Sequence, residues 1–122
     1  MKAGAIFDVE SGYRKSYMDK NLFMLGLEQL VNMGLKYIME QMKKGIDSQD
    51  FWVLRTVCCS LKEIADYHGA KELSNQSAEL KKHADLKEME HIYPVYSDVA
   101  RNIFYVRRSL IKYLKENLGT IE

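Results

Sequence analysis

Apolar residues recur every three or four positions between residues 19 and 44, and this spacing predicts a long amphipathic helix. Asp19 is the expected N-cap, and Gly45, which follows two lysines, is expected to end the helix. Gly26 and Gly34 each cost a helix about 1 kcal/mol relative to alanine, so we expect a neighbouring element to pack closely on them. The predicted apolar stripe consists of Phe23, Leu27, Leu30, Gly34, Ile38 and Met42, with Leu35 and Met39 beside it.

The same periodicity predicts two further helices. The first is expected to begin at a cap provided by Asp47 or Ser48 and to end at Gly69. The next is expected to start at Ala70 and to lead to a turn at which Asp85 caps the final helix. The predicted inner faces are Phe51, Leu54, Val57, Cys58, Leu61, Ala65 and His68 in the first, and Leu73, Ser77, Leu80 and Ala84 in the second.

The final helix is the longest, because its apolar period continues to about Leu118. Pro94 lies early in this helix and is expected to kink it without breaking it. At the other end of the chain, residues 1–18 are expected to form a short helical segment with Asp8 as N-cap and Gly12 limiting its length. The apolar positions of the final helix are Met89, Ile92, Tyr96, Val99, Ile103, Val106, Leu110 and Leu114.

Four amphipathic helices joined by short links predict a single domain over residues 1–122. The chain contains one proline and no strand-like alternation of apolar and polar residues. Short links make successive helices antiparallel neighbours. The predicted fold is therefore all-α: an antiparallel up-down-up-down four-helix bundle preceded by a short N-terminal helical segment.

Composition argues against several functions. The formal charge is +1, whereas binding to nucleic acid favours a strongly basic surface. No apolar run reaches about 18 residues, so no membrane span is expected, and no signal peptide is expected either. Cys58 and Cys59 are adjacent, which makes an internal disulfide improbable and favours a reducing, cytoplasmic setting. His68, His83 and His91 lack the spacing of a zinc site, and we expect no metal or cofactor.

The most informative stretch reads Cys59-Ser60-Leu61-Lys62-Glu63, followed by Gly69-Ala70. It resembles the active helix of histidine-containing phosphotransfer (HPt) domains, which carry His-x-x-Lys-Gly, then Gly-Ala and a helix with a leucine stripe. The resemblance covers nearly the whole chain, from the N-terminal segment to the final helix with its early proline. Lys62, Gly69 and Ala70 match the family pattern, whereas Cys59 occupies the phosphoacceptor position and Glu63 the glycine position.

Both departures imply that phosphotransfer has been lost. Phosphoryl transfer depends on positioning and charge stabilisation, so neighbouring groups cannot substitute for the missing imidazole. A cysteine of ordinary pKa is only a few per cent ionised at neutral pH, and Glu63 adds a negative charge one turn from Cys59. The resemblance therefore implies a non-catalytic module of two-component phosphorelay signalling that binds the receiver domain of a response regulator or hybrid kinase. The expected partner-binding face consists of Met33, Lys36, Arg55, Cys59, Lys62, Glu63 and Asp66.

One residue of this face, Lys62, has two interpretations. Lys62 could meet an approaching partner or simply pair with Asp66 four residues later. Counting along the two helices places Cys59 level with residues 33–36 of the preceding helix, which is why Met33 and Lys36 are included.

Two other functions remain open. An active relay would use His68 or Cys59 as a non-standard acceptor, although His68 falls in an apolar stripe where a half-buried, hydrogen-bonded structural role is simpler. The chain could also be a structural bundle in which an exposed Cys59 senses thiol oxidation. His83 and His91 flank the predicted turn and are expected to face solvent.

Overall fold

The computed structural model describes residues 7–17 and 19–118, and within these residues every regular element is helical and no strand occurs. The all-α prediction is thus confirmed. The elements are α1 (Val9–Ser16), α2 (Lys20–Gln29), the π-helical turn η2 (Leu30–Gly34), α3 (Leu35–Asp47), α4 (Phe51–Tyr67), α5 (Lys71–Asp85) and α6 (Met89–Leu118).

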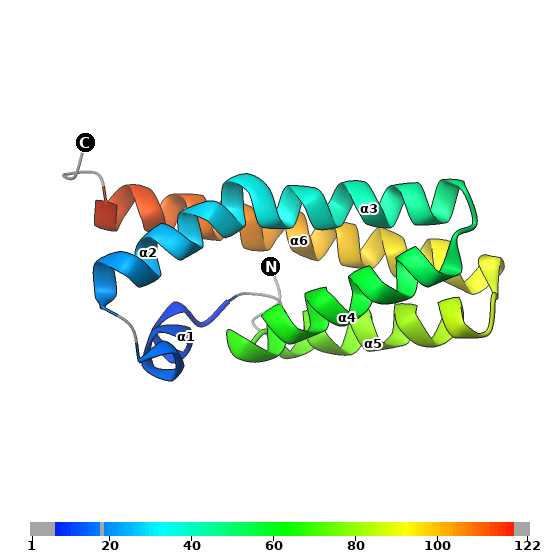
Figure 1. Ribbon diagram of the computed structural model, residues 1–122, viewed down its shortest axis with the longest axis horizontal. Coiled ribbons are helices and arrows are strands. Elements are labelled where there is room, and N and C mark those ends of the chain that lie inside the picture. Colours follow the sequence, from blue (N-terminus) through cyan, green and yellow to red (C-terminus); the bar gives the residue numbers. More distant parts are fainter. Residues whose placement is uncertain (1–6, 18, 119–122) are drawn as a thin grey trace.

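The helices lie alongside one another, as Figure 1 shows. α2, η2 and α3 run end to end as one long rod, and α6 lies beside this rod. α4 packs against α3 and α5, and α5 packs against α6, with the chain turning back at each of the three links. Among the described residues, α1 contacts α2 and the C-terminal end of α4, and the Tyr113 hydroxyl of α6 donates a hydrogen bond to Glu10 at 3.5 Å. These contacts are few, so α1 is weakly attached to the other helices.

The predicted inner faces of α4, α5 and α6 largely form the core. Cys58 and Leu61 of α4 are buried, and so are all four predicted positions of α5. Of the predicted positions of α6, Met89 and Tyr96 are only partly buried. α6 continues through Pro94 as one helix, as the unbroken apolar phase predicts. The largest fully buried side chains are Leu35, Met42, Leu54, Leu61, Leu73, Leu80, Ile92 and Leu110.

The first predicted helix contains a π-helical turn that the sequence did not reveal. Phe23, Leu27, Val31 and Leu35 follow one another at intervals of four residues. A regular α-helix has 3.6 residues per turn, so three such intervals would rotate the line of side chains about the helix axis by about 120°. In η2 the backbone N–H of Leu35 instead bonds to the carbonyl of Leu30, five residues earlier, and this wider turn absorbs the rotation. Leu30 and Gly34, which were predicted for the stripe, are therefore only partly buried, with Leu30 packed against the core. The fully buried positions of this part are Phe23, Met24, Leu27, Val31 and Leu35.

The link between α3 and α4 differs from the prediction. α3 continues through Gly45 to Asp47. The cap of α4 is Asp50, whose carboxylate accepts a hydrogen bond from the Val53 backbone N–H at 3.1 Å. Ser48 instead donates from its hydroxyl to the Lys44 carbonyl at 2.6 Å, so neither of the predicted residues caps α4.

The turn before α6 also lies further along the chain than predicted. Asp85 is the last residue of α5, and α6 begins at Met89. The backbone N–H of Ile92 bonds to the carbonyl of Glu88, so Glu88 stands at the start of α6. Asp85 is therefore not the cap of α6 and is available for the ion pairs described below.

The glycines pack differently from the prediction. Gly26 is exposed, and no atom lies within 4 Å of a Cβ placed there, so nothing packs closely on it. A Cβ at Gly34 would meet only Leu30 of the same helical rod. The close approach occurs at Gly45, where a Cβ would lie 3.2 Å from the backbone nitrogen of Leu54. Gly12 does not end α1, which continues to Ser16.

Candidate functional site

Of the two adjacent cysteines in α4, one faces the core and the other faces solvent. Cys58 is buried at 1% exposure, and burial raises the pKa of its thiol to about 12. Cys59 is exposed. Because neighbouring residues on a helix point about 100° apart, a single residue step takes the side chain from the core to the surface. The predicted orientation of this pair is thus confirmed.

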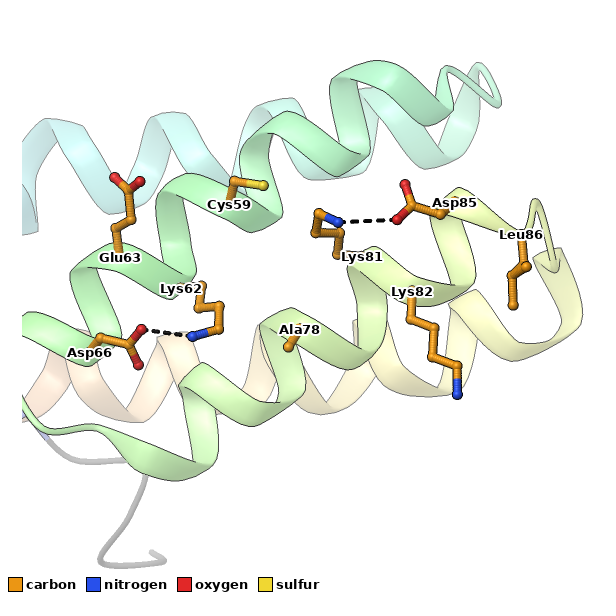
Figure 2. A pocket seen from close by; sticks show the side chains of 9 residues that line it. All are labelled: Cys59, Lys62, Glu63, Asp66, Ala78, Lys81, Lys82, Asp85 and Leu86. Carbon is orange, nitrogen blue, oxygen red and sulfur yellow. Dashed lines mark hydrogen bonds and ion pairs between the residues drawn. The ribbon is translucent and has the colours of Figure 1, made fainter.

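Cys59 lies in an open groove between α4 and α5, shown in Figure 2. We call this surface the α4–α5 groove. It is formed by the C-terminal halves of the two helices, and both helices contribute charged side chains. Its lining residues are Cys59, Lys62, Glu63 and Asp66 from α4, and Ala78, Lys81, Lys82, Asp85 and Leu86 from α5 and the residue after it.

One end of the α4–α5 groove is organised by Asp66. Its carboxylate forms an ion pair with Lys62 at 2.8 Å, which confirms the predicted pairing at i and i+4. The same carboxylate accepts a hydrogen bond from the hydroxyl of Ser74 in α5. The Lys62 ammonium, followed by the Ser74 hydroxyl, holds the pKa of Asp66 below its ordinary value. Asp66 therefore stays ionised and joins α4 to α5 at this end.

The other end of the groove is organised by Asp85. Its two carboxylate oxygens pair with Arg55 at 3.0 Å and with Lys81 at 3.1 Å. Arg55 belongs to the first turns of α4, so this pair joins the beginning of α4 to the end of α5. Arg55 thus reaches the groove through its ion pair rather than by lining it.

Glu63 lies at the rim of the groove. Figure 2 shows its carboxylate pointing away from the Lys62–Asp66 pair. It therefore adds a negative charge on the exposed face of α4 beside Cys59 without being neutralised by Lys62.

Met33 and Lys36 are exposed but are not among the lining residues of the α4–α5 groove. The contact between Gly45 and Leu54 sets the register of α3 against α4. Counting equal numbers of residues from this contact places Cys59 level with about Glu40 rather than with residues 33–36. The expected alignment is off by more than a turn, because the link between the two helices lies later in the chain than predicted.

His68 is more deeply buried than expected. Its exposure is 6%, and its ring stacks on Phe7 with centroids 4.7 Å apart. The expected hydrogen bond is absent at Nδ1, which is buried and has no partner among the described residues. Burial, followed by the nearby Lys15 charge, lowers the pKa of His68 to about 4, so the ring is neutral near pH 7.

The two remaining histidines meet at the turn between α5 and α6. Their rings stack with centroids 5.1 Å apart, and His83 Nδ1 lies 2.9 Å from the Glu88 carboxylate. This hydrogen bond lowers the pKa of Glu88. His91 is exposed as expected, whereas the side chain of His83 is only 17% exposed. Within the described residues, no group of histidine, cysteine and acidic side chains has the geometry to hold a metal ion.

The sequence reasoning missed the α5 side of the groove. The predicted face contains residues of α4 and of the helix before it, whereas the groove is also lined by Lys81, Lys82 and Ala78 of α5. One signal was present, because Lys81 and Asp85 stand at i and i+4 and form the ion pair found in the structure.

Comparison with known proteins gives no relative from which a function can be transferred: no family model, curated protein or solved structure matches the chain. None of the helices over residues 7–17 and 19–118 is long and apolar enough to cross a membrane.

Proposed function

We propose that this chain is a non-catalytic HPt-like module of the cytoplasm that binds a receiver domain through the exposed face of α4 and the α4–α5 groove. The proposal includes the finer fold: α3 to α6 as the antiparallel four-helix bundle of that family, preceded by α1. The observation that carries it is the exposure of Cys59 at the middle of α4, where the resemblance puts the phosphoacceptor, with Lys62 and Lys81 in the same groove.

The chemistry of this face favours binding over transfer. An acceptor must attack phosphorus in line from an exposed nucleophilic atom, and no imidazole lines the groove. The exposed Glu63 carboxylate would also repel the phosphate of an incoming aspartyl phosphate. A partner surface would instead meet a row of charges in which Lys62, Lys81 and Arg55 are already paired with acids.

His68 is a poor alternative acceptor. Its ring is covered by Phe7 and by α1, and its exposure is 6%. In-line attack would require the whole N-terminal segment to move away first. The burial of His68 therefore supports the non-catalytic form of the proposal.

Titration calorimetry against the receiver domains of the source organism tests the binding. We expect one or more to bind, and Lys82→Glu in the groove to weaken that binding by about tenfold or more. Lys112→Glu on the exposed surface of α6 is the matched control and should leave the affinity unchanged. Binding that is absent for every receiver domain, or equally reduced by both variants, would overturn the proposal.

A gain-of-function variant tests whether this face retains the docking surface of an HPt domain. The double substitution Cys59→His with Glu63→Gly restores the family pattern at both altered positions. We expect it to take up phosphate from a phosphorylated receiver domain, as an acid-labile label, while the parent chain takes up none. Equal labelling of the parent chain would show that it is an active relay instead.

A further inference from the structure

α1 is held on the C-terminal end of α4 by hydrogen bonds to carbonyl groups. The backbone N–H of Asp8 donates to the carbonyl of His68 at 2.6 Å. The ammonium of Lys15 donates to the carbonyls of Tyr67 at 3.1 Å and Asp66 at 3.4 Å. The last carbonyls of a helix have no partners within the helix, and they carry its negative dipole end. α1 therefore supplies the donors that the end of α4 requires.

The N-terminal segment that contains Phe7 and α1 packs against the side chain of His68. Phe7 stacks on the ring nearly in parallel, and Gly12 of α1 presses against it. A Cβ at Gly12 would lie 2.3 Å from Nδ1 and 2.6 Å from Cε1 of His68, so only glycine allows this approach. Phe23 and Tyr67 also face the ring, at centroid distances of 6.1 Å and 5.1 Å. The imidazole is thus enclosed by aromatic rings and backbone.

The surroundings of the His68 ring accommodate a neutral imidazole and not a charged one. A neutral imidazole can leave Nδ1 as an unpaired acceptor, whereas an imidazolium would place a second N–H donor, with its charge, in a site that offers Nδ1 no partner. The charged groups that act on the ring come from the N-terminal segment: Lys15 opposes protonation, and Asp8 favours it more weakly. The enclosing side chains of α2 and α4, Phe23 and Tyr67, present aromatic rings to the imidazole.

We propose that α1 is a latch that leaves α4 when His68 takes up a proton, while α2 to α6 stay folded. The remaining helices pack on one another without α1, because α4 packs on α3 and α5, α5 packs on α6, and α6 packs on the long rod of α2, η2 and α3.

The direction of the pH effect follows from the two states of the ring. When α1 is released, Phe7 and Gly12 no longer cover the ring, and the pKa of His68 returns to the ordinary histidine value of about 6.5. When α1 is docked, the pKa of His68 is about 4. Protons therefore bind preferentially to the released state, and docking is strongest above about pH 6.5. Docking weakens by about tenfold for each pH unit below about 6.5 and by roughly 150-fold at about pH 4, where half of the docked rings are also protonated. Because the two pKa values differ by about 2.5 units, the limit at still lower pH is roughly 300-fold.

Hydrogen exchange of the full chain, followed by mass spectrometry from about pH 7.5 to about pH 4.5, tests the latch. After correction for intrinsic exchange, protection of residues 9–16 should fall by about tenfold per pH unit below about 6.5. Protection of α5 and α6 should remain. Simultaneous loss of protection in α1 and α6 would show global unfolding and overturn the latch.

Two variants identify the group responsible. His68→Phe keeps an aromatic ring against Phe7 but cannot take up a proton, so protection of α1 should become independent of pH. His91→Gln, at an exposed histidine, is the control and should keep the parent pH dependence. If His68→Phe does not dock α1, a proton NMR titration of the His68 ring in the parent chain decides. Titration near the ordinary value with α1 still protected would overturn the proposal, and titration well below it would support it.

Discussion

The Arg107 side chain in α6 donates a hydrogen bond from Nε to the carbonyl oxygen of Val31, 2.9 Å away. Val31 lies inside η2, where the regular ladder of an α-helix is interrupted. The guanidinium therefore supplies a donor at the point where the helical rod departs from regular geometry, and it fixes α6 against that point.

Removing this donor should destabilise the fold. Arg107→Met keeps a long side chain but leaves the Val31 carbonyl without this bond, and we expect unfolding free energy to fall by about 1–2 kcal/mol. Urea denaturation measures the loss. Arg101→Met is the control, because the one interaction of Arg101 with the described residues is an exposed pair with Asp98 at 3.6 Å, and this variant should lose less than about 0.5 kcal/mol. Equal losses in both variants would contradict the assigned role of Arg107.

Two glycines should respond to alanine in opposite directions. Gly12→Ala places a methyl group into the His68 ring, and we expect α1 to lose its docked position at a cost of about 1–3 kcal/mol. Gly26→Ala meets no atom within 4 Å in an exposed helical position, so it should stabilise by about 0.5–1 kcal/mol. Thermal and urea unfolding of both variants measure the difference, and a loss of stability in Gly26→Ala would refute the packing described for it.

The start of α4 can be checked by removing its cap. Asp50→Ala deprives the Val53 N–H of its acceptor and should cost about 1 kcal/mol. Asp47→Ala removes only an exposed ion pair with Lys43 and should change stability by less than about 0.5 kcal/mol. The reverse order of the two losses in urea denaturation would mean that the helix starts three residues earlier.

The two thiols should differ sharply in reactivity. At about pH 7.5 an aromatic disulfide reagent should label Cys59 quickly, because its side chain is exposed. Cys58 should react only when the chain unfolds, because it is buried and its pKa is about 12. Cys59→Ser should abolish the fast phase, and Cys58→Ser should leave it intact. Fast labelling of both thiols in the native chain would contradict this packing.

The sequence predicted most of the helical architecture because burial follows a regular period in α4, α5 and α6. The orientation of Cys58 and Cys59 follows from that period, and so does the Lys62–Asp66 pair. These features depend on spacing within one helix, which a sequence displays directly.

The sequence did not predict features that depend on contacts between residues far apart in the chain. The π-helical turn is supported by Arg107, which stands 76 residues after Val31. The cap of α4 was misplaced because Asp47, Ser48 and Asp50 are all good cap residues within one short link. Because the cap was placed too early in the chain, the predicted alignment of α3 against α4 was shifted, and Met33 was predicted to lie next to Cys59.

The candidate site was predicted on one side only. Lys81 and Lys82 belong to the groove because α5 packs along α4, and no spacing within either helix reveals their distance from Cys59. The unpartnered Nδ1 of His68 was also missed, since it depends on α1 covering the end of α4.

The pairs at Asp66 and Asp85 fasten α4 to α5 on both sides of Cys59, through Ser74 at one end and Arg55 at the other. These two contacts oppose a widening of the hairpin by a hinge motion about either of them. The α4–α5 groove should therefore keep its width, so the receiver domain proposed to bind there would have to match a surface that is already formed. Loss of either contact is expected to let the groove vary in width before it destabilises the fold.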